Sequence, residues 1–175
     1  MIGGDGMAES FLTLMAEYGD ADQKKISLWY DALQDAGFRG TQTRDLRHHI
    51  SLATFPLDQE AEAVRLMQDV AGRFAPRQAD IRHMGVMPGG KVLFAAPDMH
   101  PSLTALKKAC GTDPVGGYPW LPHTTLLIDT PDTVADALKV LVKHFAPITA
   151  QITALRLCAF WPKREIAWAK LTGEE

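Results

Sequence analysis

Two short segments of the sequence place a histidine close to a hydroxyl residue in the same way. Residues 49–52 read HISL and residues 123–126 read HTTL, so the histidines are His49 and His123. A histidine with an unperturbed pKa of about 6.5 can give or take a proton at neutral pH. A hydroxyl group can hydrogen-bond a phosphate oxygen. Two such pairs facing each other across a cleft could hold a phosphate and move protons on both sides of it.

The two hydroxyl residues that follow the histidines are Ser51 and Thr125. Side chains alternate between the two faces of a strand, so each hydroxyl shares a face with its histidine, roughly 6–7 Å further along. His48 has Ile50 two positions on and therefore lacks a hydroxyl partner. This difference favours His49 over its neighbour as the residue that does chemistry.

The rest of the sequence predicts the elements that position these segments. Apolar periodicity predicts four helices, over 20–36, 58–74, 99–110 and 131–145. Alternating apolar residues and turn residues predict single strands over 11–16, 49–55 and 123–128. They also predict two strand pairs, over 79–97 with a turn at 88–90 and over 148–171 with a turn at 161–163. Each half therefore reads as strand, helix, strand opening with histidine, helix, and strand pair, with the strand at 92–97 both ending the first half and beginning the second. This internal repeat predicts an α+β fold of two pseudo-twofold-related lobes, each an antiparallel sheet with two helices, around a central cleft. We expect a single bilobal domain over 10–175, with 1–9 as a flexible terminus.

The paired pattern of histidine, any residue, serine or threonine, and an apolar residue resembles the two-histidine phosphoesterase superfamily. Within it, the chain is most similar to the 2′-5′ RNA ligase and cyclic phosphodiesterase group, over about residues 10–171 in element order. The resemblance implies acid and base roles for His49 and His123, and phosphate binding by Ser51 and Thr125. One departure is Ile128, which stands where bacterial RNA-ligase-like members often carry an arginine.

Basic and aromatic residues flank both motifs and are candidate substrate contacts. Arg44 and Arg47 precede the first motif, and these two or Lys163 and Arg164 could supply the positive charge that the missing arginine would give. Tyr118 and Trp120 precede the second motif, and Trp161 lies in the last turn. An aromatic ring can stack a nucleobase, but Trp120 could equally fill the interface between the lobes.

Composition and charge weigh against several other classes of protein. The net charge of −3 gives no overall field that would attract long nucleic acids. The longest apolar runs are too short to cross a bilayer, and residues 1–10 lack the pattern of a signal peptide. Two distant cysteines fit a reducing compartment, and no acidic or thiol ligand lies near the histidines at metal-binding spacing. We therefore expect a cytoplasmic monomer with no metal, no cofactor, no membrane contact and no obligate protein partner.

Three functional hypotheses follow from these features. The first is a metal-independent phosphoesterase that hydrolyses a 2′,3′-cyclic phosphate, or a related cyclic phosphodiester, of a nucleotide or short RNA end. One histidine would deprotonate the attacking water while the other protonates the leaving oxygen. The second is a catalytically silent module that holds a nucleotide or RNA end in the same cleft and leaves it intact. The third is an α+β domain in which the histidines are structural.

Overall fold

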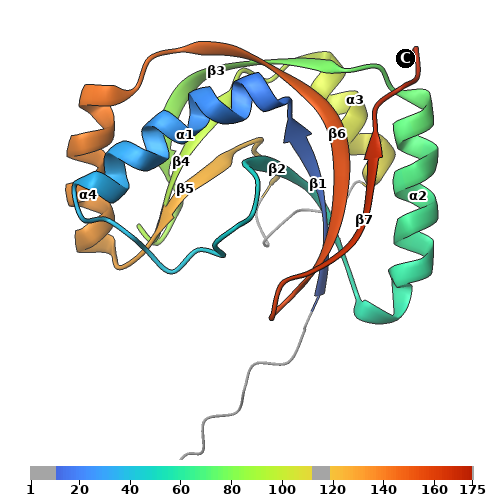
Figure 1. Ribbon diagram of the computed structural model, residues 1–175, viewed down its shortest axis with the longest axis horizontal. Coiled ribbons are helices and arrows are strands. Elements are labelled where there is room, and N and C mark those ends of the chain that lie inside the picture. Colours follow the sequence, from blue (N-terminus) through green and yellow to red (C-terminus); the bar gives the residue numbers. More distant parts are fainter. Residues whose placement is uncertain (1–10, 112–118, 175) are drawn as a thin grey trace, which may run out of the picture.

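The computed structural model describes residues 11–111 and 119–174 (Figure 1). Within them lie four α-helices, one short 3₁₀ helix and seven strands. The helices are α1 (Asp20–Asp35), α2 (Glu60–Arg73), α3 (Pro101–Cys110) and α4 (Pro131–His144), and the 3₁₀ helix is Leu57–Gln59. The strands are β1 (Phe11–Tyr18), β2 (His49–Phe55), β3 (Arg77–Val86), β4 (Val92–Pro97), β5 (Thr124–Ile128), β6 (Ile148–Phe160) and β7 (Arg164–Lys170). The expected flexible terminus and Tyr118 lie outside the described residues.

The seven strands form one antiparallel sheet, which confirms the α+β fold. The order is β2-β1-β6-β3-β4-β5, and β7 pairs with β6. The long strand β6 connects the two halves, because Ile148–Ile152 pair with β3 and Ile152–Phe160 pair with β1. The sheets of the two halves are therefore continuous through this strand, and the motif strands β2 and β5 lie at the two ends of the order.

The helices cover the sheet in two pairs, with α1 and α4 at one side of the molecule and α2 and α3 at the other (Figure 1). In α1 the fully buried residues Ile26 and Leu33 and the nearly buried Trp29 recur at helical spacing. The ring of Trp29 lies 4.7 Å from that of Phe145, just after α4, and joins this pair of helices. The other face of β1 and β2 carries the buried residues Met15 and Glu17 beside Ser51 and His49.

Candidate active site

The register of the sheet decides what lies beside the first motif. His49 pairs with Glu17 and Ser51 pairs with Met15 across the β2–β1 ladder. Paired side chains lie on the same face of a sheet. His49 and Ser51 therefore share their face with these β1 residues, while Ile50 is fully buried in the core on the other face.

Both motif strands contain a β-bulge at the same place. In β2 the register skips Leu52, directly after Ser51, and in β5 it skips Leu126, directly after Thr125. In each strand the two residues that follow the hydroxyl are buried in the core. A bulge changes which face the later side chains meet. The strict alternation expected along residues 49–55 therefore ends at Ser51, and Ala53 joins the core instead of the histidine face.

The two histidine rings are held by the same backbone contact. His49 Nδ1 lies 2.8 Å from the carbonyl oxygen of Arg47, and His123 Nδ1 lies 2.9 Å from that of Leu121. A carbonyl oxygen only accepts hydrogen bonds, so Nδ1 donates at both sites. Nε2 of each neutral ring is thus left with its lone pair, ready to take a proton from a substrate or water.

Buried hydrogen bonds tie the two motif strands together. Tyr18 Oη lies 2.9 Å from Thr124 Oγ1, and Thr124 Oγ1 donates to the carbonyl oxygen of His49 at 3.1 Å. Because the threonine hydrogen is used in this way, Tyr18 must be the donor to Thr124. Burial raises the pKa of Tyr18, so its hydroxyl keeps the proton that it donates. The polar residue at the second position of HTTL therefore connects the two motifs.

The side chain of Trp120 makes a further connection between the motifs. Its Nε1 donates to the carbonyl oxygen of Ser51 at 2.9 Å, and its ring packs against the main core. This contact binds the loop before β5 to the strand β2. Trp120 therefore contacts the first motif from the loop that leads to the second.

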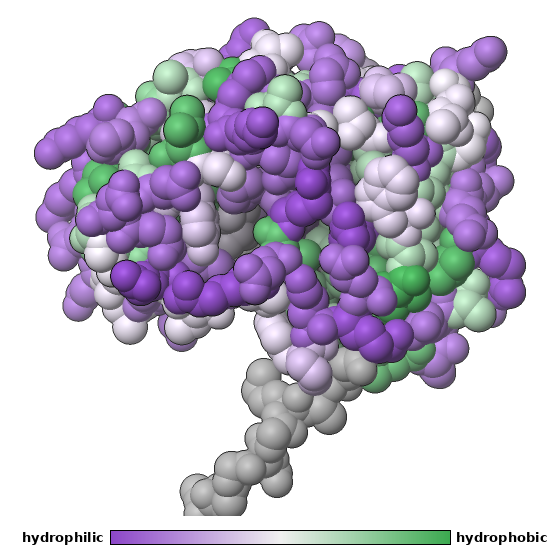
Figure 2. Space-filling model, viewed as in Figure 1, coloured by the Kyte–Doolittle hydropathy of each residue, from purple (hydrophilic) through white to green (hydrophobic). Residues whose placement is uncertain are grey.

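A cleft of about 530 Å³ is lined by His49 and Ser51 of the first motif and by Thr125 of the second, whereas His123 is not among its lining residues. Figure 2 shows this face hollowed between helix α1 and the loop before β2, with mainly hydrophilic residues along the loop. The cleft brings together several of the residues that the sequence singled out, which are Arg44, Arg47, His49, Ser51, Thr125, Ile128 and Trp161. Phe11, Met15 and Phe160 supply an apolar part of its lining. Its size suits a nucleotide-sized ligand.

Electrostatic coupling links the two histidines across the site. Burial lowers the pKa of His49. The hydrogen bond to the Arg47 carbonyl and the charge of the Glu17 carboxylate raise this pKa, and the charge on His123 lowers it. Burial also lowers the pKa of His123, against a smaller opposing effect of the Leu121 carbonyl. Both rings are therefore neutral at lower pH than an ordinary histidine.

The side chain of His48 has a different environment from that of His49. Its Nε2 lies 3.1 Å from Ser27 Oγ, and its ring meets that of Tyr30 edge-on at 5.9 Å. Its backbone N–H and carbonyl both bind the side-chain amide of Gln23. Burial, with smaller contributions from His49 and Arg47, lowers its pKa to about 4. His48 thus anchors the start of β2 to helix α1 as a neutral ring.

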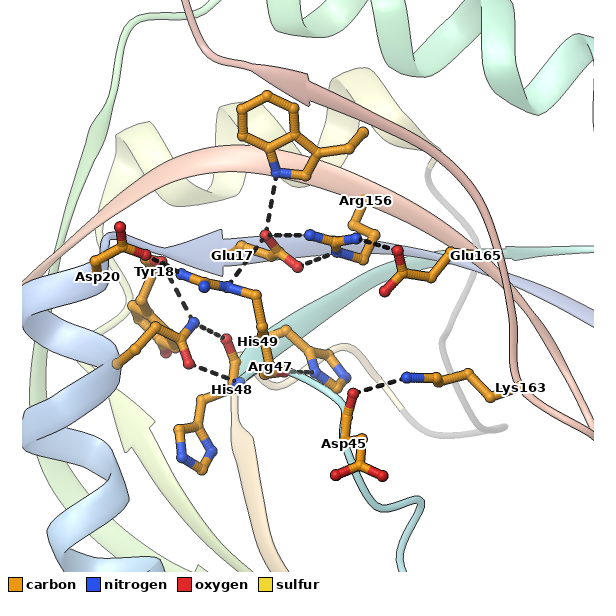
Figure 3. Close-up of polar contacts among 12 residues, drawn as sticks. Glu17, Tyr18, Asp20, Asp45, Arg47, His48, His49, Arg156, Lys163 and Glu165 are labelled. Carbon is orange, nitrogen blue, oxygen red and sulfur yellow. Dashed lines mark hydrogen bonds and ion pairs between the residues drawn. The ribbon is translucent and has the colours of Figure 1, made fainter.

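The sequence reasoning missed a buried charge network beside His49. Glu17 is only 3% exposed and accepts bonds from the guanidinium of Arg156, at Nε and at Nη2, and from Trp168 Nε1 at 3.2 Å. Arg47 Nε lies 3.6 Å from the same carboxylate, and its Nη2 binds Asp20 at 2.6 Å. Figure 3 shows Glu17 between the two guanidinium groups. The signal available in the sequence was one acidic residue in an otherwise apolar strand.

The loop that carries Arg44 is held at both of its ends. Near its start, Thr41 N donates to the carbonyl oxygen of Ile128 at 2.8 Å. Near its end, Trp161 Nε1 donates to Thr43 Oγ1 at 3.2 Å and Lys163 Nζ donates to the carbonyl oxygen of Asp45 at 2.7 Å. The loop thus runs from the end of β5 to the β6–β7 turn. It brings Arg44 to the cleft beside Ile128, the position at which the expected arginine is missing.

Comparison with known proteins identifies the family. The sequence profile of the 2′-5′ RNA ligase superfamily matches residues 23–160. The chain belongs to this superfamily. The predicted membership of the two-histidine phosphoesterases is thereby confirmed. A sequence search of curated proteins found no match.

Solved structures with low sequence identity share the fold of this superfamily member. E. coli LigT in its apo form aligns with a TM-score of 0.64 at 17% identity, covering 94% of this chain and 99% of LigT. TT0787 of Thermus thermophilus gives 0.64 at 16% identity, covering 94% of this chain and 100% of its own. E. coli LigT has also been solved with 3′-AMP, again with a TM-score of 0.64, 17% identity and coverage of 94% and 99%. The likeness extends over nearly the whole of each chain and establishes the fold.

The described residues were also considered for metals and membranes. Within 11–111 and 119–174, no three histidine, cysteine or acidic side chains gather as metal ligands would. None of the helices in these ranges is long and apolar enough to span a bilayer. Both cysteines, Cys110 and Cys158, are buried and free.

Proposed function

We propose that this protein hydrolyses the 2′,3′-cyclic phosphate of a nucleotide or short RNA end, or a related cyclic phosphodiester, without a metal. The observation that carries this proposal is the matched pair of histidines. His49 and His123 each donate Nδ1–H to a backbone carbonyl and keep Nε2 free. A bulge follows the hydroxyl residue of each motif. Two equivalent proton-transfer groups are what an in-line attack at phosphorus requires.

The reaction can be written with these groups alone. One histidine takes a proton from water at Nε2 as the water oxygen attacks phosphorus. The bond from phosphorus to one ribose oxygen breaks, and the other histidine donates its proton to that oxygen. Ser51 and Thr125 hydrogen-bond the non-bridging phosphate oxygens, and Arg44 balances their negative charge. The product is a phosphomonoester, and the two histidines have exchanged their protonation states.

The relatives support a nucleotide as the ligand. E. coli LigT has been solved with 3′-AMP, with ATP and with NADP⁺, so the same fold accommodates adenine nucleotides. The cleft of the present protein has a volume typical of small-ligand sites, and Trp161 lines it together with Phe11. An aromatic ring and an apolar wall suit a nucleobase, while the hydroxyl and guanidinium groups suit its phosphate.

Turnover of a cyclic mononucleotide tests the proposal directly. The protein, with and without EDTA, is incubated with a 2′,3′-cyclic nucleotide, and the phosphomonoester is followed by chromatography. We expect hydrolysis that EDTA leaves unchanged. Tight binding without product would instead favour the silent binding module. Loss of activity with EDTA and recovery with zinc would contradict the metal-independent mechanism, while neither binding nor product would mean that the histidines are structural.

The charge near the cleft limits how many phosphates can bind at once. Arg44 and Arg47 are the guanidinium groups that line the cleft among the described residues, and Arg47 already binds Asp20 and Glu17. The logarithm of the affinity for a nucleic acid falls linearly with the logarithm of the salt concentration, and the slope is proportional to the number of phosphates contacted. We therefore expect a log–log salt slope no steeper than about −2 for a short RNA end. A steep slope would indicate a longer basic surface.

A further inference from the structure

A second hollow of about 300 Å³ lies next to the cleft. Its walls come from the end of β1 and the start of α1 on one side and from β6 and β7 on the other. Arg47 borders both spaces, so the two meet at this side chain. The mechanism proposed above uses none of the residues that line the second hollow.

The register of the sheet places the second hollow in line with the proposed catalytic residue. Glu17 pairs with His49 on one side and with Ala154 on the other, and Ala154 pairs with Lys170. These four residues form a row across β2, β1, β6 and β7. With neighbouring strands about 4.8 Å apart, the row is roughly 14 Å long. The small side chain of Ala154 in the middle of the row leaves room above the sheet.

An aromatic ring with a fixed orientation stands at the far wall of the hollow. Trp168 on β7 is 53% exposed. Its Nε1 donates to Glu17 at 3.2 Å, so the polar edge of the indole is satisfied and the ring is held toward the hollow. A nucleobase can stack on such a ring, and little conformational entropy is lost because the ring is already in place.

A cation stands beside this ring. Lys170 lies two residues along the same strand, is exposed, and lines the same hollow. It makes no ion pair with any residue in the described ranges, whereas Arg47 and Arg156 are both bound by carboxylates. The ammonium group can therefore meet a phosphate without first giving up a protein partner. An aromatic face next to an unpaired cation suits a nucleotide better than an uncharged ligand.

We propose that the second hollow is a subsite for the nucleotide that precedes the cyclic end. Its base stacks on Trp168 and its phosphate lies near Lys170, while the cyclic phosphate lies between His49 and His123. This inference rests on the proposed function and narrows its substrate class to a dinucleotide or longer RNA end. Because stacking releases no counterions, the salt dependence that the second nucleotide adds comes from the single phosphate near Lys170.

The test compares a cyclic mononucleotide with a dinucleotide that carries the same cyclic end. We expect the parent protein to favour the dinucleotide in kcat/KM by about tenfold or more, a typical gain from one stacked base. Trp168→Ala should remove most of that preference through KM, and Trp168→Phe should keep most of it because a ring remains. Val142→Ala, at another exposed apolar side chain, is the matched control and should change nothing.

A binding measurement gives a second readout that does not depend on turnover. Calorimetry with a dinucleotide 3′-phosphate should show weaker binding to Trp168→Ala than to the parent, and Lys170→Gln should make the salt slope shallower by about one. The subsite would be overturned if the parent and Trp168→Ala bound the dinucleotide 3′-phosphate equally well. It would also be overturned if Trp168→Ala kept the preference for the dinucleotide substrate. Either result would leave the proposed function standing. Failure of both substrates to react would instead count against the proposed function, and calorimetry would still decide the subsite.

Discussion

The two motif strands are alike in backbone geometry and differ in the groups that surround them. His49 and His123 make the same Nδ1 contact, at 2.8 and 2.9 Å, and both strands bulge directly after the hydroxyl residue. Beside His49, however, lies the buried carboxylate of Glu17, whereas the ring of Phe94 lies 5.5 Å from that of His123. The repeat thus preserves the backbone contact of the two histidines while allowing their proton affinities to differ. An acid and a base need such a difference.

The residue before each histidine shows a second difference. In the first motif, His48 is bound to α1 through Gln23 and Ser27. In the second motif this position is Pro122, which is buried and has no backbone N–H to donate. The first strand is therefore anchored to its helix by polar contacts. The second is anchored through Trp120 and Thr124 to the first strand itself.

Removal of either motif histidine should have the largest effect. We expect His49→Ala and His123→Ala each to lower kcat on a cyclic phosphate by about 10²–10⁴-fold, because each removes one of the two groups proposed to transfer a proton. Circular dichroism should show that both variants fold. Similar losses of kcat in the two variants would show that the shared backbone geometry of the two motifs affects the rate more than their different surroundings do.

His144→Ala is the control for the histidine variants, since His144 is an exposed histidine at the end of α4. It should keep full activity. Rates within a few-fold of the parent for either motif variant would contradict the assignment of that histidine. A large loss for one variant alone would show that the two halves are not equivalent in the reaction.

The contrast between His48 and Pro122 predicts how stability depends on pH. The pKa of His48 is about 4 in the folded protein, below the unfolded value of about 6.5. The unfolded chain therefore binds the proton first, and stability is complete above about pH 6.5 and is lost as the pH falls toward 4. The loss from this group is about 3 kcal/mol at most.

Urea unfolding of the parent and of His48→Gln, at about pH 7 and about pH 4.5, measures this contribution. The parent should lose more of its free energy of unfolding over this interval than the variant does. His49 and His123 contribute in the same direction in both proteins, so the difference isolates His48. An equal loss in both proteins would show that His48 is not held neutral by its contacts with α1.

The sequence predicted local features of the fold well. Residues 49–55 were expected as a strand and form β2 with the same bounds, and the helices begin and end within two residues of expectation. Such features follow from hydrophobic periodicity and from turn residues, which act over a few positions. The pairing of histidine with hydroxyl was readable for the same reason, because it depends only on alternation over two residues.

Features that depend on distant pairing could not be predicted. Glu17 meets Arg156 and Trp168, which lie 139 and 151 residues further along the chain. These contacts exist because β1, β6 and β7 align in one register, which the pattern within a single strand does not specify. The sharing of β6 between the two halves was missed for the same reason. Its length was visible, but its two sets of partners were not.

The two hydroxyls proposed to bind phosphate offer a matched test of the two halves. Ser51→Ala and Thr125→Val each remove one hydroxyl from the cleft at little cost in packing. We expect each to lower kcat/KM by about tenfold or more, the usual worth of a hydrogen bond to a charged group. Thr125→Ser should retain most of the activity because it keeps the oxygen. An unchanged kcat/KM in either variant would remove that hydroxyl from the proposed phosphate site.

The smallest effect should come from Glu17→Gln, which keeps the shape of the side chain and removes its charge. The negative charge of Glu17 favours the protonated form of His49 and raises its pKa against the effect of burial. Without this charge the pKa of His49 must fall further, while His123, which has no such neighbour among its pKa determinants, should not change. One limb of the pH profile of kcat/KM should therefore move to lower pH, and the other should stay in place.

The limb that moves identifies the role of His49. If the alkaline limb moves, His49 acts in its protonated form and is the acid. If the acidic limb moves, it acts in its neutral form and is the base. Glu165→Gln is the control, since Glu165 binds Arg156 at 2.8 Å but does not pair with His49. Movement of both limbs would mean that the substitution disturbs the whole cleft. A pH profile that does not move at all would show that the carboxylate of Glu17 serves only to hold Arg47 and Arg156. The electrostatic surroundings of His49 and His123 would then be as alike as the backbone of their strands.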